Sequence, residues 1–199
     1  MIAAVVLSAG ESSRMGKPKA LLPVQGVPFI ERIVLSLKST KVGKIILVLG
    51  HNADELIPKI SHLPATVLIN REYKKGQLSS LLLGIRQLKS GEDAKTVDGV
   101  LVHLVDHPFI NPPLVDHMID CFYETKKLII VPRFKGKRGH PVIFSSRLFS
   151  ELLETPLEQG AKAVVHAHRE ETLEIETDDE GVTIDIDTPE EYRQYVRRQ

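Results

Sequence analysis

The chain has 199 residues, of which 42% are apolar, and its 26 basic and 26 acidic residues give a net charge of zero. This length predicts a single domain over residues 1–199 that buries a core without disulfides or structural metals. The neutral balance argues against a protein that binds nucleic acid or membrane surfaces. No apolar run approaches the ~18 residues of a membrane span, and the lone cysteine, Cys121, cannot form an intramolecular disulfide. We therefore expect a soluble, cytoplasmic protein.

Short apolar runs alternate with helical patterns along most of the chain. Residues 2–7, IAAVVL, form the first run, as expected for a central strand that is covered on both faces. Further strands are predicted at 44–49, 66–69, 100–105 and 128–131, and helices at 28–38, 52–60, 76–89 and 112–125. The alternation predicts an α/β fold, a three-layer α/β/α sandwich with a mostly parallel, Rossmann-like central sheet.

The last third of the chain departs from this alternation. Shorter strands are predicted at 142–144, 172–177 and 182–186, and helices at 146–154 and 188–198. Some of these strands are expected to be antiparallel.

A glycine-containing loop, LSAGESSRMGKPK at residues 7–19, follows the first predicted strand. It is not a Walker A loop, because five residues separate Gly10 from Gly16 and Pro18 replaces the hydroxyl residue that binds magnesium. It is not a dinucleotide-binding fingerprint either. Gly10 has no glycine partner two positions later, and Pro18 and Pro23 keep the chain extended before the next helix.

This loop is nevertheless predicted to bind phosphate. A stretch of roughly twenty residues between a strand and a helix is usually functional. Gly10 lets backbone N–H groups approach anionic oxygens, while Arg14, Lys17 and Lys19 supply up to three cations. In open α/β sheets, ligands bind beyond the carboxyl ends of the strands, where Asp106 also emerges. A solvated basic surface loop is the alternative interpretation.

The segment LSAGESSRMGKPKALLPVQGVPFIERIV, residues 7–34, resembles the signature of nucleotidyltransferases with a glycosyltransferase-A-like, nucleotide-diphospho-sugar transferase-like fold. Within that superfamily the chain is similar to the molybdenum cofactor cytidylyltransferase group. Further segments match in order and spacing at 74–85, 104–119, 135–152, 158–165 and 185–192. The resemblance implies transfer of a nucleoside monophosphate to a phosphorylated acceptor with release of pyrophosphate, and Mg²⁺ as the cofactor.

The resemblance implies nucleotide binding by two segments. These are the loop residues Leu7, Ser8, Ala9, Gly10, Arg14, Gly16 and Lys19 and the helix-start residues Gly76, Ser79 and Ser80. Arg14 and Lys19 would grip the triphosphate and act in catalysis together with Asp106, whereas Lys17, at a variable family position, is expected to be solvated. For Gly76, Ser79 and Ser80 a capped core helix is an equally acceptable interpretation.

Asp106 and Asp187 are the predicted magnesium ligands, with Asp185 as the fallback. Mg²⁺ prefers one or two carboxylates together with phosphate oxygens and waters. Asp106 is too far from the helix that begins near Pro112 to cap it directly. Asp187 could instead cap the last helix, and the resemblance favours ligation.

The chain departs from the family pattern on both sides of Asp106, where Val105 and His107 replace the common glycine and the common glutamine or methionine. A zinc site of His103, Asp106 and His107 is disfavoured. On a strand, His103 and Asp106 point to opposite faces, and no cysteine or further histidine nearby in the sequence completes four ligands.

Residues of the pterin-side acceptor site are implied by the resemblance at Arg138, Gly139, His140, Pro141 and Gly160. A plain turn is the alternative for the first four. His166 and His168, on the helix after Gly160, are expected at the surface.

The predicted reaction is Mg²⁺-dependent transfer of CMP from CTP to molybdopterin or molybdenum cofactor, which gives the cytosine dinucleotide, with a molybdenum hydroxylase as a receiver of the product. Three alternatives stay open: GTP as the donor, a different acceptor such as a sugar phosphate, and a non-catalytic cofactor-binding chaperone. Ala9 favours CTP, since related guanylyltransferases typically carry glycine there.

Overall fold

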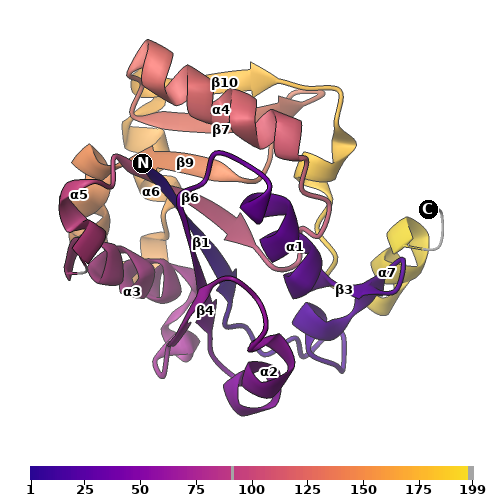
Figure 1. Ribbon diagram of the computed structural model, residues 1–199. Coiled ribbons are helices and arrows are strands. Elements are labelled where there is room, and N and C mark those ends of the chain that lie inside the picture. The colour runs from indigo at the N-terminus through magenta and orange to yellow at the C-terminus, as the bar shows by residue number, and fades with distance from the viewer. Residues whose placement is uncertain (91, 197–199) are drawn as a thin grey trace.

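The computed structural model describes residues 1–90 and 92–196 (Figure 1). The strands are β1 (Ile2–Ser8), β2 (Pro23–Val24), β3 (Val27–Pro28), β4 (Lys44–Leu49), β5 (Thr66–Ile69), β6 (Gly99–Leu104), β7 (Ile129–Phe134), β8 (Lys137–Arg138), β9 (Val142–Ser145) and β10 (Thr172–Glu176). The helices are α1 (Phe29–Lys38), α2 (Ala53–Ile60), α3 (Gln77–Ser90), α4 (Pro112–Thr125), α5 (Phe149–Glu154), α6 (Lys162–Ala167) and α7 (Pro189–Val196).

The central sheet has the order β10-β7-β9-β6-β1-β4-β5, with β8 paired to β7 at one end. Strands β1, β4, β5 and β6 are mutually parallel, and β7 and β10 are parallel to each other. Strand β9 runs antiparallel to both of its neighbours, β6 and β7. The predicted mostly parallel sheet is therefore confirmed, and β9 is one of the antiparallel strands expected in the last third.

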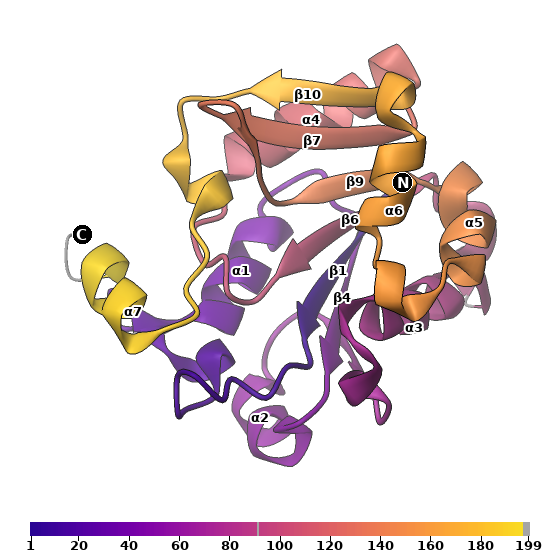
Figure 2. The same cartoon turned by 180° about the vertical axis from the view of Figure 1, so that it is seen from behind.

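Two apolar cores lie on opposite faces of this sheet. In β1, Ala4 and Val6 join the core under α1, α2 and α4, whereas Val5 and Leu7 join the core under α3, α5 and α6. Successive side chains of a strand point to opposite faces, so a continuous apolar run fills both cores. Figures 1 and 2 show the two helical layers from opposite sides. The three-layer α/β/α sandwich is confirmed.

The strand predicted at 182–186 is wrong. Residues Glu180–Thr183 form a 3₁₀ turn that begins where the Asp179 side chain accepts a hydrogen bond from Gly181 N (2.8 Å). The following residues are extended but pair with single positions of other loops, as when Ile186 N donates to the Asp106 carbonyl (2.9 Å). Apolar and polar residues alternate here because one side of an extended segment is buried, which does not require a sheet partner.

The C-terminal helix, predicted at 188–198, is α7 in the structure, and positions 197 and 198 lie outside the described residues. It packs beside the β2–β3 hairpin, where the Tyr192 hydroxyl donates to the Pro23 carbonyl (2.6 Å). This contact holds α7 against the hairpin that follows the glycine loop. Within the described ranges, none of the helices combines the length and apolar character that a bilayer crossing requires.

Strands β1, β4 and β6 end at the same edge of the sheet. Ser8 is paired in register with Leu49, and Leu7 with Leu104. The loops after β1 and β4 approach each other closely at Gly50. A Cβ at this position would lie 2.4 Å from the Ala9 carbonyl oxygen and clash with it, so only glycine fits here. The loops that follow these strands therefore meet, as expected for parallel strands.

Candidate active site

The glycine loop curls around Ser12. The Ser12 carbonyl accepts hydrogen bonds from Met15 N (3.0 Å) and Gly16 N (3.2 Å), and its hydroxyl accepts one from Lys19 N (3.2 Å). Ser12 and Gly16 both have positive φ, 52° and 67°. The curl leaves Lys17 exposed and turns Lys19 inward, where it is 8% exposed.

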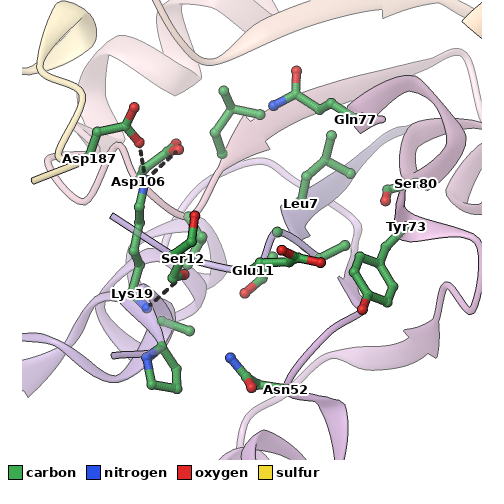
Figure 3. Close-up of a pocket in the computed structure, with 18 of the residues that line it drawn as sticks. Leu7, Glu11, Ser12, Lys19, Asn52, Tyr73, Gln77, Ser80, Asp106 and Asp187 are labelled. Carbon is green, nitrogen blue, oxygen red and sulfur yellow. Dashed lines mark hydrogen bonds and ion pairs between the residues drawn. The ribbon is translucent and has the colours of Figure 1, made fainter. Parts of the chain in front are cut away.

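Lys19 lies between two carboxylates that come from distant parts of the chain. Its Nζ is 3.4 Å from Asp106 Oδ2 and also pairs with Asp187 Oδ1 (Figure 3). Arg14, whose side chain is 68% exposed, pairs with the other oxygen of Asp187. Burial alone would raise the pKa of Asp187, but the hydrogen bond and charge of Lys19, with those of Arg14, hold that pKa below its usual value.

Asp187 is not the cap of the last helix. Thr188 Oγ1 accepts a hydrogen bond from Glu191 N (3.2 Å), and Glu191 Oε2 accepts from the N–H groups of Thr188 and Asp187 (2.8 Å each). This is a capping box. It leaves the Asp187 carboxylate pointing at Lys19 and Arg14. Asp106 is not a cap either, because Asn111 Oδ1 accepts from Leu114 N (3.3 Å) at the start of α4.

A cavity of about 360 Å³ opens above the glycine loop. The predicted residues that line it are Leu7, Ser8, Ala9, Gly10, Arg14, Lys19, Gly76, Ser80, Asp106 and Asp187. Gly16 and Ser79 are not among the lining residues. Ser79 Oγ donates to the Gly76 carbonyl (2.7 Å) and accepts from Asn70 Nδ2 (2.9 Å), so it holds the turn before α3. Asn52 and Tyr73, which the sequence does not predict to lie at the site, also line this cavity (Figure 3).

Asp185, the fallback ligand, lies with Asp106 and His107. One potential ligand atom from each of the three falls within 4.8 Å of the others. Burial, followed by repulsion from Asp106 and Asp187, raises the pKa of Asp185 to about 6. Asp106 therefore belongs to two groups. It lies near Asp185 and His107 as a potential metal ligand, and it shares Lys19 as an ion-pair partner with Asp187. That Asp187 is a metal ligand stays a prediction.

Three histidines form a buried cluster behind Asp106. The ring centroid of His107 lies 4.9 Å from that of His140 and 6.4 Å from that of His103. His103 Nε2 is 2.8 Å from the His107 carbonyl, and we assign it as the donor. Burial lowers the pKa of His103 to about 3 and that of His107 to about 2, so both rings are neutral.

The zinc site was disfavoured partly because the sequence shows no further histidine near Asp106. Folding brings His140 to this place from a separate segment of the chain. His103 lies outside the group of three potential ligands, in agreement with its expected orientation away from Asp106.

A second cavity, of about 990 Å³, lies against the N-terminal part of α3 and strands β7 and β9. Of the predicted acceptor residues, Arg138, Gly139, His140 and Gly160 line it, whereas Pro141 does not. Arg138 Nε donates to Glu174 Oε1 (2.8 Å). His166 is exposed at this cavity, as expected, but His168 is half-buried and lies 2.7 Å from Glu151.

Leu7 and Gln77 line both cavities, so the two share a wall. Gln77 is the first residue of α3 and directly follows Gly76. Its place between the two cavities could not be predicted from the neighbouring sequence, because it depends on β1 and α3 packing together.

Curated relatives of similar identity carry names of different kinds. Purine catabolism protein PucB of Bacillus subtilis is 29% identical over 98% of this chain and 95% of its own length. Nicotine blue oxidoreductase of Paenarthrobacter nicotinovorans is 26% identical over 96% and 94%. Molybdenum cofactor cytidylyltransferase of Escherichia coli is 26% identical over 94% and 92%. Identity at this level does not single out one substrate.

A crystal structure of Rv0371c from Mycobacterium tuberculosis H37Rv superposes with a TM-score of 0.84 at 27% identity, covering 98% of this chain and 97% of the other. A manganese complex of Rv0371c gives a TM-score of 0.82 at 25% identity, covering 100% and 99%. The family model of the MobA-like NTP transferase domain matches residues 4–172. The glycine loop, the carboxylates of Asp106, Asp185 and Asp187, and the fold thus occur together in a chain that belongs to the MobA-like NTP transferase family.

Proposed function

We propose that this nucleotidyltransferase transfers CMP from CTP to molybdopterin or molybdenum cofactor and releases pyrophosphate. The observation that carries the proposal is the shared wall between the two cavities. One cavity combines the cations of Arg14 and Lys19 with the carboxylates of Asp106 and Asp187. The other is larger, lined mostly by apolar residues, and bordered by Arg138 and Lys162. This arrangement suits a triphosphate on one side and a bulky anionic acceptor on the other.

A divalent cation fits the carboxylates of Asp106 and Asp187 in the first cavity. Asp106 Oδ1 is buried and has no hydrogen-bond partner within residues 1–90 and 92–196, which leaves a carboxylate lone pair available to a metal. The manganese complex of Rv0371c supports a divalent ion in this family. Asp106 and Asp187 would hold Mg²⁺ or a similar ion. The bound ion would neutralise charge on the phosphates of the donor.

The side chains of the loop exchange partners when nucleotide binds. In the free protein Lys19 and Arg14 pair with Asp187. A triphosphate offers them more negative charge, so both cations turn to it and release the carboxylate for metal binding. An anionic phosphate oxygen of the acceptor then attacks the α-phosphorus, and the bond to the β-phosphate breaks. Lys19 and Arg14 stabilise the departing pyrophosphate.

Label transfer from α-labelled CTP and α-labelled GTP tests the donor and the acceptor together. Each nucleotide is incubated with purified molybdenum cofactor or with a hexose 1-phosphate, and the labelled product is identified by mass. We expect label from CTP on the cofactor. Label on the cofactor from GTP alone would show that GTP is the donor, and label on the sugar phosphate would show that the acceptor is a sugar phosphate. Binding of the cofactor without label transfer would show that the protein is a non-catalytic carrier. Ala9, which lines the first cavity, supports CTP.

Substitution of Lys19 by alanine is expected to weaken CTP binding about 10- to 100-fold, because a hydrogen bond to a charged group contributes about 1.5–3 kcal/mol. Lys17→Ala is the matched control, since Lys17 lies two positions away and is exposed. Calorimetric titration of both variants with CTP in the presence of Mg²⁺ measures the difference. Equal affinities for CTP in the two variants would show that Lys19 does not bind the triphosphate.

A further inference from the structure

His107 offers a metal-ligating atom that the predicted magnesium site does not use. It is 8% exposed, and its Nδ1 hydrogen-bonds to nothing in the described part of the chain. The neighbouring Asp106 Oδ1 is equally buried and equally without a partner there. Among the described residues, His103 Nδ1 and His140 Nδ1 are unpartnered in the same cluster, but only Asp106 and His107 place an unsatisfied atom on residues of a potential ligand group. Burying such atoms is costly unless something binds them.

Asp185 completes a group of three. Each of Asp106, His107 and Asp185 contributes one potential ligand atom, and these atoms lie within 4.8 Å of one another. Neighbouring ligand atoms around an ion at about 2.1 Å are about 3.0–3.4 Å apart, and only an opposite pair reaches about 4.2 Å. Closure of at most about 1.8 Å between any two of these atoms, shared by side-chain rotation of both residues, brings the group to metal-binding distances.

Lys19 does not have to leave for this site to fill. Its Nζ lies 3.4 Å from Oδ2 of Asp106, whereas the unpartnered oxygen is Oδ1. The carboxylate can therefore contact the lysine and an ion at once. His103 and His140 adjoin His107 from the core side and lie outside the group of three. They pack against the imidazole and hold it in place.

We propose that Asp106, His107 and Asp185 form a mixed nitrogen and oxygen site that binds a first-row transition-metal ion, with Mn²⁺ as its probe, in preference to Mg²⁺. Imidazole is a good ligand for transition metals, whereas Mg²⁺ selects oxygen ligands. Three protein ligands leave positions open for phosphate oxygens. A catalytic role for this ion rests on the proposed function, because Asp106 belongs both to this site and to the proposed reaction. Binding of the metal ion alone does not rest on it.

Paramagnetic resonance of Mn²⁺ with the metal-free protein, in the absence of nucleotide, tests the proposal. The signal of free Mn²⁺ reports binding, and competition with Mg²⁺ gives the relative affinities. We expect the unaltered protein to bind one Mn²⁺ at least about tenfold more tightly than Mg²⁺. His107→Gln should weaken Mn²⁺ binding about 10- to 100-fold and Mg²⁺ binding by less than about threefold. Equal affinities for the two ions, or unchanged Mn²⁺ binding in His107→Gln, would overturn the proposal.

His62→Gln is the matched control, since it removes an exposed imidazole that lies outside the ligand group and away from His107. It should keep Mn²⁺ binding within about twofold of the unaltered protein. Pulsed resonance gives a readout that needs no variant, because a coordinated imidazole modulates the Mn²⁺ echo through its ¹⁴N nucleus. Absence of that modulation in the unaltered protein would overturn the proposal. Loss of label transfer with intact Mn²⁺ binding would instead contradict the proposed function alone.

Discussion

Replacement of Asp106 by asparagine should lower the rate of pyrophosphate release by about 10³-fold or more. The side chain keeps its shape but loses the charge that would hold a divalent cation in the proposed function, and such an ion contributes several kcal/mol of transition-state stabilisation. Each 1.36 kcal/mol is worth about a factor of ten in rate. The fold should survive, because Ile186 N bonds to the backbone carbonyl of residue 106 and not to the side chain.

The matched control for this variant is Asp178→Asn. Asp178 is an exposed aspartate outside both cavities, so its substitution should leave the rate unchanged. Steady-state rates and melting temperatures of the two variants are measured side by side. Unchanged turnover in Asp106→Asn would show that this carboxylate does not take part in the reaction. A fall in melting temperature of more than about 4 °C would mean that the lost rate reflects lost folding.

The protein should lose about 3 kcal/mol of folding free energy between pH 6.5 and pH 5. Burial depresses the pKa of His103 to about 3 and that of His107 to about 2. In the unfolded chain these groups take up protons below about pH 6.5, whereas in the folded protein they stay neutral. Each of these two histidines therefore lowers the free energy of unfolding by up to about 1.4 kcal/mol for every pH unit below that value. His140, also with a lowered pKa, acts in the same direction.

Urea unfolding at pH 7, 6 and 5 measures this loss. Asp185 has the opposite effect on stability, because its raised pKa favours the folded state as the pH falls. It offsets only part of the loss, since it is one exposed group against two buried histidines and the half-buried His140. His103→Asn should recover about 2 kcal/mol of the difference between pH 6.5 and 5. His166→Asn, at an exposed position, should recover none. Constant stability from pH 7 to pH 5 would contradict a buried, neutral histidine cluster.

The sheet and its site-bearing rim were predictable because they follow from short-range patterns. Strands such as β1 and β4 are apolar at nearly every position, which marks them as central and parallel. Once the strands are parallel, the loops that begin at Ala9 and Asp106 must meet at their carboxyl ends. The Lys19 to Asp106 contact is a consequence of that geometry.

The histidine cluster and the shared wall depend on tertiary packing. His140 reaches His107 only because β9 inserts antiparallel between β6 and β7. The strand expected at 182–186 failed for a related reason. Its apolar residues are buried, as when Ile184 and Ile186 pack with Phe29, but they cover the side of the molecule and not the face of a sheet. Alternation reports burial of one side of a segment and does not reveal what covers it.

Pyrophosphate release with purified molybdenum cofactor, a divalent cation and each nucleoside triphosphate in turn tests the central claim most directly. The two adjoining cavities imply that release requires donor and acceptor together. We predict rapid release with CTP only when the cofactor is present, and little with CTP alone. Release at the same rate without an acceptor, or none with any nucleotide when cofactor and metal are supplied, would contradict nucleotidyl transfer between the two cavities.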